Sequence, residues 1–175
     1  MYKRQIRACL YYNYVSRKLI LAFKHGDKLQ LTPFLTPLMA CDFAMMTDGE
    51  DSPAVAVPLH EQRYFRRRYK QSAKLARKLC HITAHGSLTT DILVRRRAMA
   101  SQGGLSHHQQ HCNIARAFSI GQCGCTRLAS RPVVLANDVM ATGAILFTAT
   151  KCLSAAVSGP VSALVVVRVA RPREP

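Results

Sequence analysis

Hydrophobic and polar residues follow two patterns along the chain. In some stretches the apolar residues recur every three or four positions, which places them on one face of an α-helix. Other stretches are short, continuous apolar runs, which are typical of buried strands. The first pattern predicts helices at 14–25, 29–39, 72–80 and 144–156, with a further helix from Ser106. The second predicts strands at 54–57, 91–94, 132–136 and 161–169.

The segments between these elements are rich in polar and glycine residues. The acidic stretch 42–53 predicts a surface loop, the glycine-rich stretch 98–104 a flexible segment, and 137–143 a turn. The order strand, helix, strand over 132–169 predicts a βαβ unit with parallel strands and a right-handed crossover. We therefore expect an α/β protein.

Chain length and hydropathy favour one domain without a membrane segment. The chain has 175 residues, of which 49% are hydrophobic, enough to bury a substantial core. No stretch of about eighteen apolar residues is free of charge, so no transmembrane helix and no membrane insertion are expected. The apolar run 19–23 is too short for a signal peptide. The sequence thus predicts a cytoplasmic protein.

The chain is strongly basic, with 25 Lys and Arg against nine Asp and Glu and a net charge of +16. Many of the cations lie between Arg63 and Arg97, in two groups at 66–70 and 95–97. Such a field favours a polyanionic partner, either nucleic acid or a phosphorylated small molecule. A merely solvated basic surface is the alternative.

The seven cysteines are irregularly spaced and include no CxxC pair, so we expect reduced, structural thiols and no zinc. His107, His108, His111 and Cys112 have helical spacing and could form a metal site. A solvated basic helix explains the same pattern.

Candidate chemistry concentrates in segment 133–145, where a strand leads through Asn137 and Asp138 to Thr142, Gly143 and a helix. Backbone N–H groups at a helix start lack internal partners and lie at the positive end of the helix dipole, so a phosphate can bind there. Asp138 could accept hydrogen bonds from a sugar diol. Alternatively, Asp138 and Thr142 only cap the helix.

Four segments together resemble the ComF family of competence-associated proteins. Segment 133–145 is similar to the PRPP-binding motif of type I phosphoribosyltransferases. The other three blocks occur in the family's order and cover nearly the whole chain: YVSRKLILAFKHGD at 14–27, VPLH at 57–60 with Arg63, Arg67 and Gln71, and residues 93–118 with Arg95, Arg97 and Gln102.

The chain departs from the family pattern at several positions. Asn137 replaces the first acid of the motif, Ala141 a threonine, and Ile145 the threonine that would help to bind phosphate. Further departures are Arg68, Lys70 and Gln110. The family's zinc ribbon is not expected, because the chain starts too late to contain it. The resemblance therefore implies a PRPP loop that has lost some of its contacts.

The resemblance implies a type I phosphoribosyltransferase-like fold, with a twisted, mainly parallel sheet, flanking helices and a flexible hood. Residues 1–50 would form an N-terminal helical segment and 51–175 the phosphoribosyltransferase-like domain. Asp138 would be the catalytic residue and hold the ribose hydroxyls. The phosphate-binding set would be Asn137, Asp138, Ala141, Thr142, Gly143, Ala144 and Ile145, and the pyrophosphate and hood set Arg63, Arg67, Arg95, Arg97 and Gln102.

Two functions follow from this interpretation. The first is binding or transfer of the phosphoribosyl group of PRPP, or binding of another phosphorylated ribose, with Mg²⁺ accompanying PRPP. The second is a non-catalytic competence or DNA-uptake factor that binds single-stranded DNA through the basic patch. A homodimer is compatible with either function.

Overall fold

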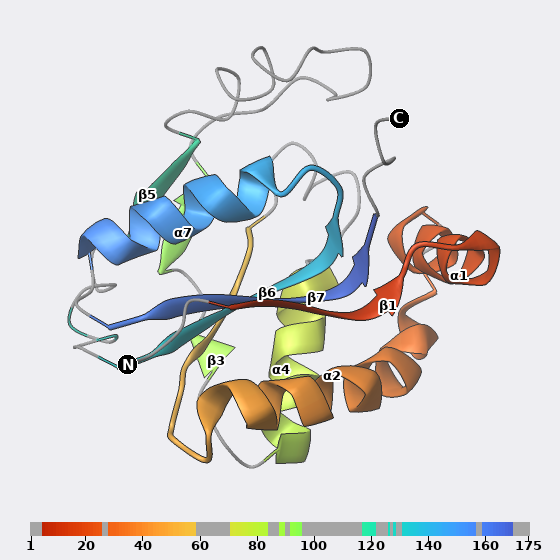
Figure 1. Cartoon of the computed structure of the whole chain (residues 1–175), viewed down its shortest axis with the longest axis horizontal. Helices are drawn as coiled ribbons and strands as arrows, with labels where there is room; N and C mark the ends of the chain where they lie inside the picture. Colours follow the sequence, from red (N-terminus) through yellow and green to blue (C-terminus); the bar gives the residue numbers. More distant parts are fainter. Residues whose placement is uncertain are drawn as a thin grey trace, which may run out of the picture.

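The computed structural model describes residues 5–25, 28–58, 71–83, 88–89, 92–95, 117–121, 126, 128, 131–156 and 159–169. In these ranges five strands form one sheet (Figure 1). Their order across the sheet is β1 (Ile6–Tyr11), β7 (Val161–Arg168), β6 (Val133–Met140), β2 (Ala54–Ala56) and β3 (Leu88–Thr89). All neighbouring strands pair in parallel. The predicted α/β class is confirmed, with parallel pairing of β6 and β7.

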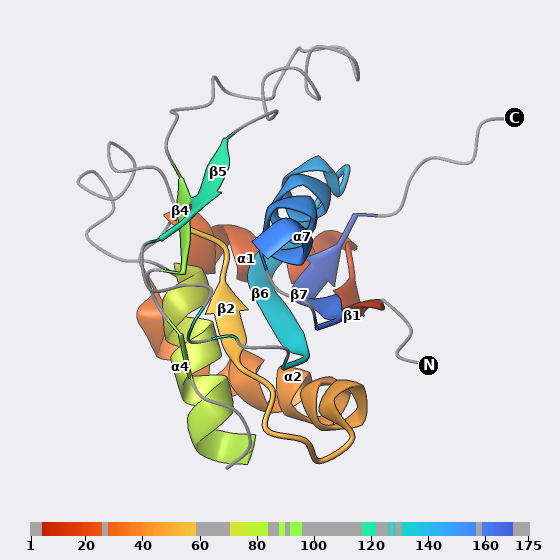
Figure 2. The same ribbon diagram turned by 90° about the vertical axis from the view of Figure 1, so that its left-hand side faces the viewer.

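Helices flank both faces of this sheet. On one face lie α1 (Tyr14–His25), α2 (Thr32–Thr47) and α4 (Gln71–Thr83), with the short 3₁₀ helix η1 (Leu29–Leu31) before α2. On the other face lie α7 (Ala144–Ala156) and an antiparallel ribbon of β4 (Leu93–Arg95) and β5 (Phe118–Ile120) (Figure 2). No helix within the described ranges is both long enough and apolar enough to span a membrane.

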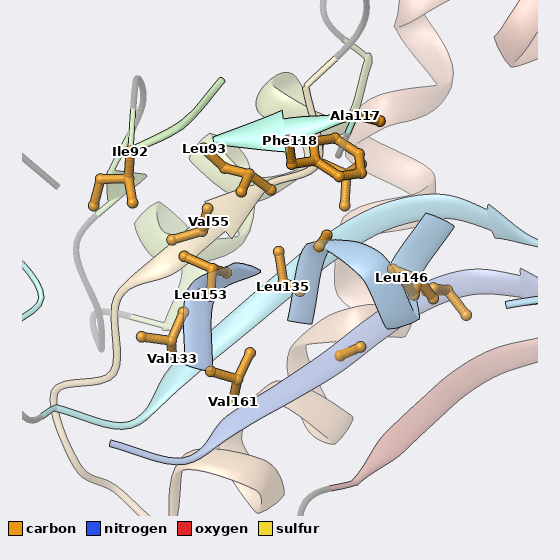
Figure 3. Packing of buried hydrophobic residues seen from close by; sticks show 14 of the residues in the cluster. Val55, Ile92, Leu93, Ala117, Phe118, Val133, Leu135, Leu146, Leu153 and Val161 are labelled. Carbon is orange, nitrogen blue, oxygen red and sulfur yellow. The ribbon is translucent and has the colours of Figure 1, made fainter. Parts of the chain in front are cut away.

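The sheet divides the core into two clusters because successive strand residues point to opposite faces. In β6, Val133 and Leu135 belong to the cluster beneath α7, whereas Val134 and Ala136 belong to the cluster shared with α2 and α4. Figure 3 shows the first cluster, in which Leu146 and Leu153 of α7 lie over Leu135 and its neighbours. Burial on both faces explains why the central strands are continuous apolar runs.

Two helices, at 14–25 and 144–156, occur as predicted, and the helix predicted at 72–80 begins one residue earlier and ends three residues later. The predicted loop at 42–53 is wrong for its first six residues, because α2 continues to Thr47. Met39, Phe43 and Thr47 are buried at four-residue intervals, and this apolar face sustains the helix. Asp42 is accommodated by Arg7, whose Nη1 lies 3.1 Å from its Oδ1.

The predicted turn at 137–143 is wrong for residues 137–140. Strand β6 runs to Met140 because it pairs with β7 as far as Met140 and Arg168. The connection to α7 therefore consists of residues 141–143. The helix expected from Ser106 and the flexible stretch 98–104 lie outside the described residues.

Strands β1, β3 and β5 were not predicted. β1 has the sequence IRACLY, in which Arg7 interrupts the apolar pattern, and its strand conformation depends on pairing with β7. Residues 1–50 therefore contain a strand as well as helices. This strand is an edge of the same sheet that residues 51–175 build.

Candidate functional site

The three-residue connection 141–143 positions the start of α7 beside the end of β6. Gly143 has φ of +80°, in the left-handed region that glycine enters without the steric cost borne by other residues. Its carbonyl oxygen accepts the backbone N–H of Phe147 at 2.8 Å, so Gly143 caps the helix and Ala144 is the first helical residue. The glycine thus permits an abrupt change from strand to helix.

The beginning of α7 carries a positive potential. The N–H groups of Ala144, Ile145 and Leu146 have no acceptor within the helix, because no helical residue lies four positions before them. Thr142 Oγ1 accepts the Ala144 N–H at 3.4 Å, a long bond that an incoming acceptor could replace. The first turn contains no acidic residue, so no carboxylate neutralises the positive end of the helix dipole. The local structure favours an anion.

This helix start opens into a cavity of about 410 Å³. Ala141 is exposed, and Thr142 and Gly143 are half-buried, so the turn is accessible from solvent. The volume lies within the range of about 300–1,000 Å³ that is usual for small-molecule sites. The cavity is lined by Ile6, Met140, Ala141, Thr142, Gly143, Ala144, Phe147, Arg168 and Val169.

Arg168 is a residue of this cavity that sequence reasoning missed. It ends β7 and pairs with Met140 at the end of β6, and the Val169 N–H donates to the Met140 carbonyl oxygen at 2.9 Å. The exposed Arg168 therefore belongs to the same cavity as the turn. The predicted parallel pairing of the two strands was the signal that could have identified Arg168, because the ends of paired parallel strands lie next to each other.

Asn137 does not line the cavity and already has partners. Its Nδ2 donates to the Val139 carbonyl oxygen at 2.8 Å, and its Oδ1 accepts the Ser72 hydroxyl at 3.2 Å. The amide thereby links β6 to the first turn of α4. This is a structural use of the residue that replaces the first acid of the expected motif.

Asp138 also lies outside the lining of the cavity. It is only 8% exposed, and its Oδ1 accepts the N–H of the next residue, Val139, at 2.9 Å. Asp138 is therefore a nearly buried residue close to the end of β6, before the turn. The structure does not bring it into the wall formed by residues 140–144.

The remaining residues of the predicted phosphate loop divide between the cavity and the core. Ala141, Thr142, Gly143 and Ala144 all line the cavity. Ile145 instead packs against the core beneath α7, which leaves its backbone N–H at the helix start and removes its side chain from the site. The expected set thus lies in one strand-turn-helix unit, although only four of its seven residues line the cavity.

Among the predicted hood residues, only Arg95 falls within the described ranges. It is buried in β4, and its guanidinium carbon lies 5.9 Å from the centre of the Phe118 ring on the paired strand. Arg63, Arg67, Arg97 and Gln102 lie outside the described residues. Their proposed contacts with pyrophosphate stay predictions.

A metal centre is not formed by the described residues: no three His, Cys, Asp or Glu side chains among them lie close enough to share an ion. The candidate ligands His107, His108, His111 and Cys112 lie outside those ranges. Comparison with protein-family models and with curated proteins gives no match for this chain.

Proposed function

We propose that this protein is a ComF-like protein of the type I phosphoribosyltransferase fold that binds PRPP or another phosphorylated ribose. The observation that carries the proposal is the open turn at 141–143, where a positive helix start and Arg168 border one cavity. The parallel sheet supports the proposal as well, since ligands of open α/β sheets bind outside the carboxyl ends of the strands.

The 5-phosphate of the ligand would lie at the start of α7. The donors to this phosphate would be the Thr142 hydroxyl and the backbone N–H groups of Gly143, Ala144 and Ile145. Arg168 would add a charged, bidentate donor from the neighbouring strand. A hydrogen bond to a charged group contributes about 1.5–3 kcal/mol, so Arg168 can offset the hydroxyl that Ile145 does not supply.

Asp138 would hold the ribose hydroxyls, as the resemblance implies. Because it is nearly buried behind the turn, the sugar would have to approach the strand end closely. The neutral Asn137 is committed to Ser72 and Val139 and would contribute little. We therefore propose phosphoribosyl binding as the primary activity, and transfer of the phosphoribosyl group as an activity to be tested separately.

Mg²⁺ would reach this site only with its ligand. None of the described residues that line the cavity carries a carboxylate, so they do not provide a magnesium site of their own there. Mg²⁺ bound to a diphosphate retains several waters and needs few protein ligands. The ion would therefore be coordinated by PRPP itself.

The alternative function, binding of single-stranded DNA, rests mainly on the basic groups at 66–70 and 95–97. Most of these residues lie outside the described ranges, so the site geometry gives the alternative no specific support. It is tested together with the main proposal.

The test is a thermal-shift titration of the full chain with PRPP and Mg²⁺, with ribose 5-phosphate, and with a poly-dT oligonucleotide. We expect both phosphorylated sugars to raise Tm, because a ligand that binds only the folded state stabilises it. Arg168→Met should weaken sugar binding about tenfold, as expected for loss of one charged hydrogen bond. Thr142→Val should weaken it less.

Lys151→Met is the matched control, because Lys151 is exposed on α7 away from the cavity. It should leave the affinity for both sugars unchanged. Absence of a Tm shift with both sugars would contradict the proposal, as would equal losses in Arg168→Met and Lys151→Met. Stabilisation by the oligonucleotide alone would favour the DNA-binding alternative.

A further inference from the structure

A second cavity lies between α2 and α4, across the sheet from α7. Its volume is about 570 Å³, and Thr32 and Pro33 of α2 and Lys74, Arg77, Lys78 and His81 of α4 line it. Figure 1 shows α2 and α4 together on the side of the sheet opposite α7. This cavity is therefore separate from the one at the 141–143 turn.

The α4 side of the cavity is a stripe of basic residues. Positions 74, 77, 78 and 81 recur at three- and four-residue intervals, so they share one face of the helix. The opposite face, with Leu75, Ala76 and Leu79, is fully buried in the core. The amphipathic pattern of α4 thus fixes the direction of these side chains and gathers their charge on the α2 side.

The charges of Arg77 and Lys78 in this stripe are not neutralised by the described residues around the cavity. None of the described residues that line the cavity is acidic. Within the described ranges, Arg77 and Lys78 form no ion pair with a carboxylate. The stripe therefore presents at least two charged groups to whatever occupies the cavity.

The α2 side contributes the start of a sixteen-residue helix. Its first turn contains no acidic residue, and no side chain caps it through a hydrogen bond. The start of α2 lies at the positive end of the helix dipole, which favours anions, although η1 precedes it directly and Pro33 has no backbone N–H to donate. The two sides of the cavity thus carry potential of the same sign.

Thr32 provides an independent sign of an absent partner. It is 8% exposed and lines the cavity, yet its Oγ1 has no hydrogen-bond partner within the described part of the chain. A buried hydroxyl without a partner costs about 1–3 kcal/mol. Oγ1 itself is shielded from solvent, so a change of the χ1 rotamer of Thr32 would bring it to a ligand oxygen in the cavity.

We infer that this cavity binds a phosphate-bearing small molecule, with a phosphate group held between the start of α2 and the α4 stripe. The phosphate accepts hydrogen bonds from Thr32 Oγ1, Arg77 and Lys78, while Pro33 and the hydrocarbon stems of the cations contact the remainder of the ligand. The cavity has the volume of a small-molecule site rather than the extended groove that tracks a nucleic-acid backbone.

The experiment is calorimetric titration of the full chain with pyrophosphate at low salt. Saturable binding is expected, and Arg77→Ala with Lys78→Ala should weaken it at least tenfold. Thr32→Val, which retains the shape of the side chain, should weaken binding severalfold. The same variant should not lower the stability of the ligand-free protein, because it removes a hydroxyl that has no partner.

Two controls distinguish this site from general attraction and from the turn at 141–143. Arg17→Ala with Lys18→Ala removes the same charge from α1 and should leave pyrophosphate binding within twofold of wild type. Arg168→Met, which tests the proposed ribose site, should also leave this binding event intact.

Three outcomes would overturn the inference. They are the absence of saturable pyrophosphate binding, equal weakening by the α1 and α4 double variants, and loss of binding in Arg168→Met alone. If a poly-dT oligonucleotide binds through Arg77 and Lys78 but pyrophosphate does not, the face is a nucleic-acid surface and the inference is wrong.

Discussion

Gly143 shapes the candidate ribose site through its backbone conformation. The space left by its absent side chain is not the reason for glycine at this position. A Cβ at this position would lie 3.7 Å from Met140 Sδ, an ordinary van der Waals contact. The demand for glycine therefore comes from φ of +80°. Gly49 has φ of +75° and therefore also favours glycine, and a Cβ there would meet nothing within 4 Å. Gly49 follows α2 and does not line the cavity, so it provides a comparison.

This pair of glycines gives a prediction about stability and binding. Gly143→Ala and Gly49→Ala should each lower the free energy of unfolding by about 1–2 kcal/mol, the cost of a left-handed non-glycine residue. Only Gly143→Ala should also weaken binding of ribose 5-phosphate, because relief of the strain moves the N–H groups at the start of α7. Chemical denaturation and sugar titration measure the two effects. Equal sugar affinity in both variants would contradict the assigned role of the turn.

At the scale of single elements, α1 has a local signal that fixes its beginning. Asn13 Oδ1 accepts the Ser16 N–H, and Ser16 Oγ accepts the Asn13 N–H, both at 2.8 Å. This is a reciprocal capping arrangement with serine in the place of the usual glutamate. Ser16 Oγ also donates to the Tyr11 carbonyl oxygen at 2.7 Å, so the cap joins α1 to the end of β1.

Removal of this cap should destabilise the protein. Asn13→Ala is expected to lower the free energy of unfolding by about 1 kcal/mol, measured by urea denaturation. Asn13→Asp retains a side-chain acceptor and should preserve most of the stability. If both variants lose the same amount, the cap does not make the expected contribution.

The elements also differ in how far the sequence predicted them. Helices α1 and α7 were predicted with their observed bounds, since an apolar face and its boundaries are local features. Strand β3 has only two residues, paired with Ala54 and Val55 of β2, and no local pattern marks it. The continuation of α2 past Asp42 follows from the burial of Phe43 and Thr47 against distant parts of the chain, and Asp42 pairs with Arg7 in a different element.

On the scale of the whole molecule, burial of cysteines couples folding to alkaline pH. Burial, followed by the charge and hydrogen bond of Asp42, raises the pKa of the Cys9 thiol to about 12. Burial likewise raises the pKa of Cys80 and Cys152. Below about pH 9 these thiols are protonated whether the chain is folded or not. Above it the unfolded chain loses protons first, and the folded state loses relative stability.

The predicted result is a decline in the free energy of unfolding as pH rises from about 9 toward 12. In Cys9→Ala the decline should be shallower, whereas Cys41→Ala, which removes an exposed thiol, should follow the wild-type slope. Denaturant titrations across this pH range measure the slopes, and the comparison among the three proteins isolates the contribution of Cys9. Identical slopes in wild type and Cys9→Ala would contradict the role assigned to Cys9.

The sequence by itself determined the features that depend on neighbouring residues. These are the amphipathic helices, the apolar central strands, and the passage from β6 through Thr142 and Gly143 to a helix start. Local spacing suffices for them because backbone conformation and helix capping involve residues only a few positions apart.

Only the tertiary structure decided which residues share a cavity. Pairing of β6 with β7 brings Arg168 beside the 141–143 turn, while Asp138, though only three residues before that turn, lies outside the cavity wall. Packing of α2 against α4 likewise gathers Thr32 with Arg77 and Lys78. These neighbours are set by strand register and by the layering of helices on the sheet, which depend on contacts between distant parts of the chain.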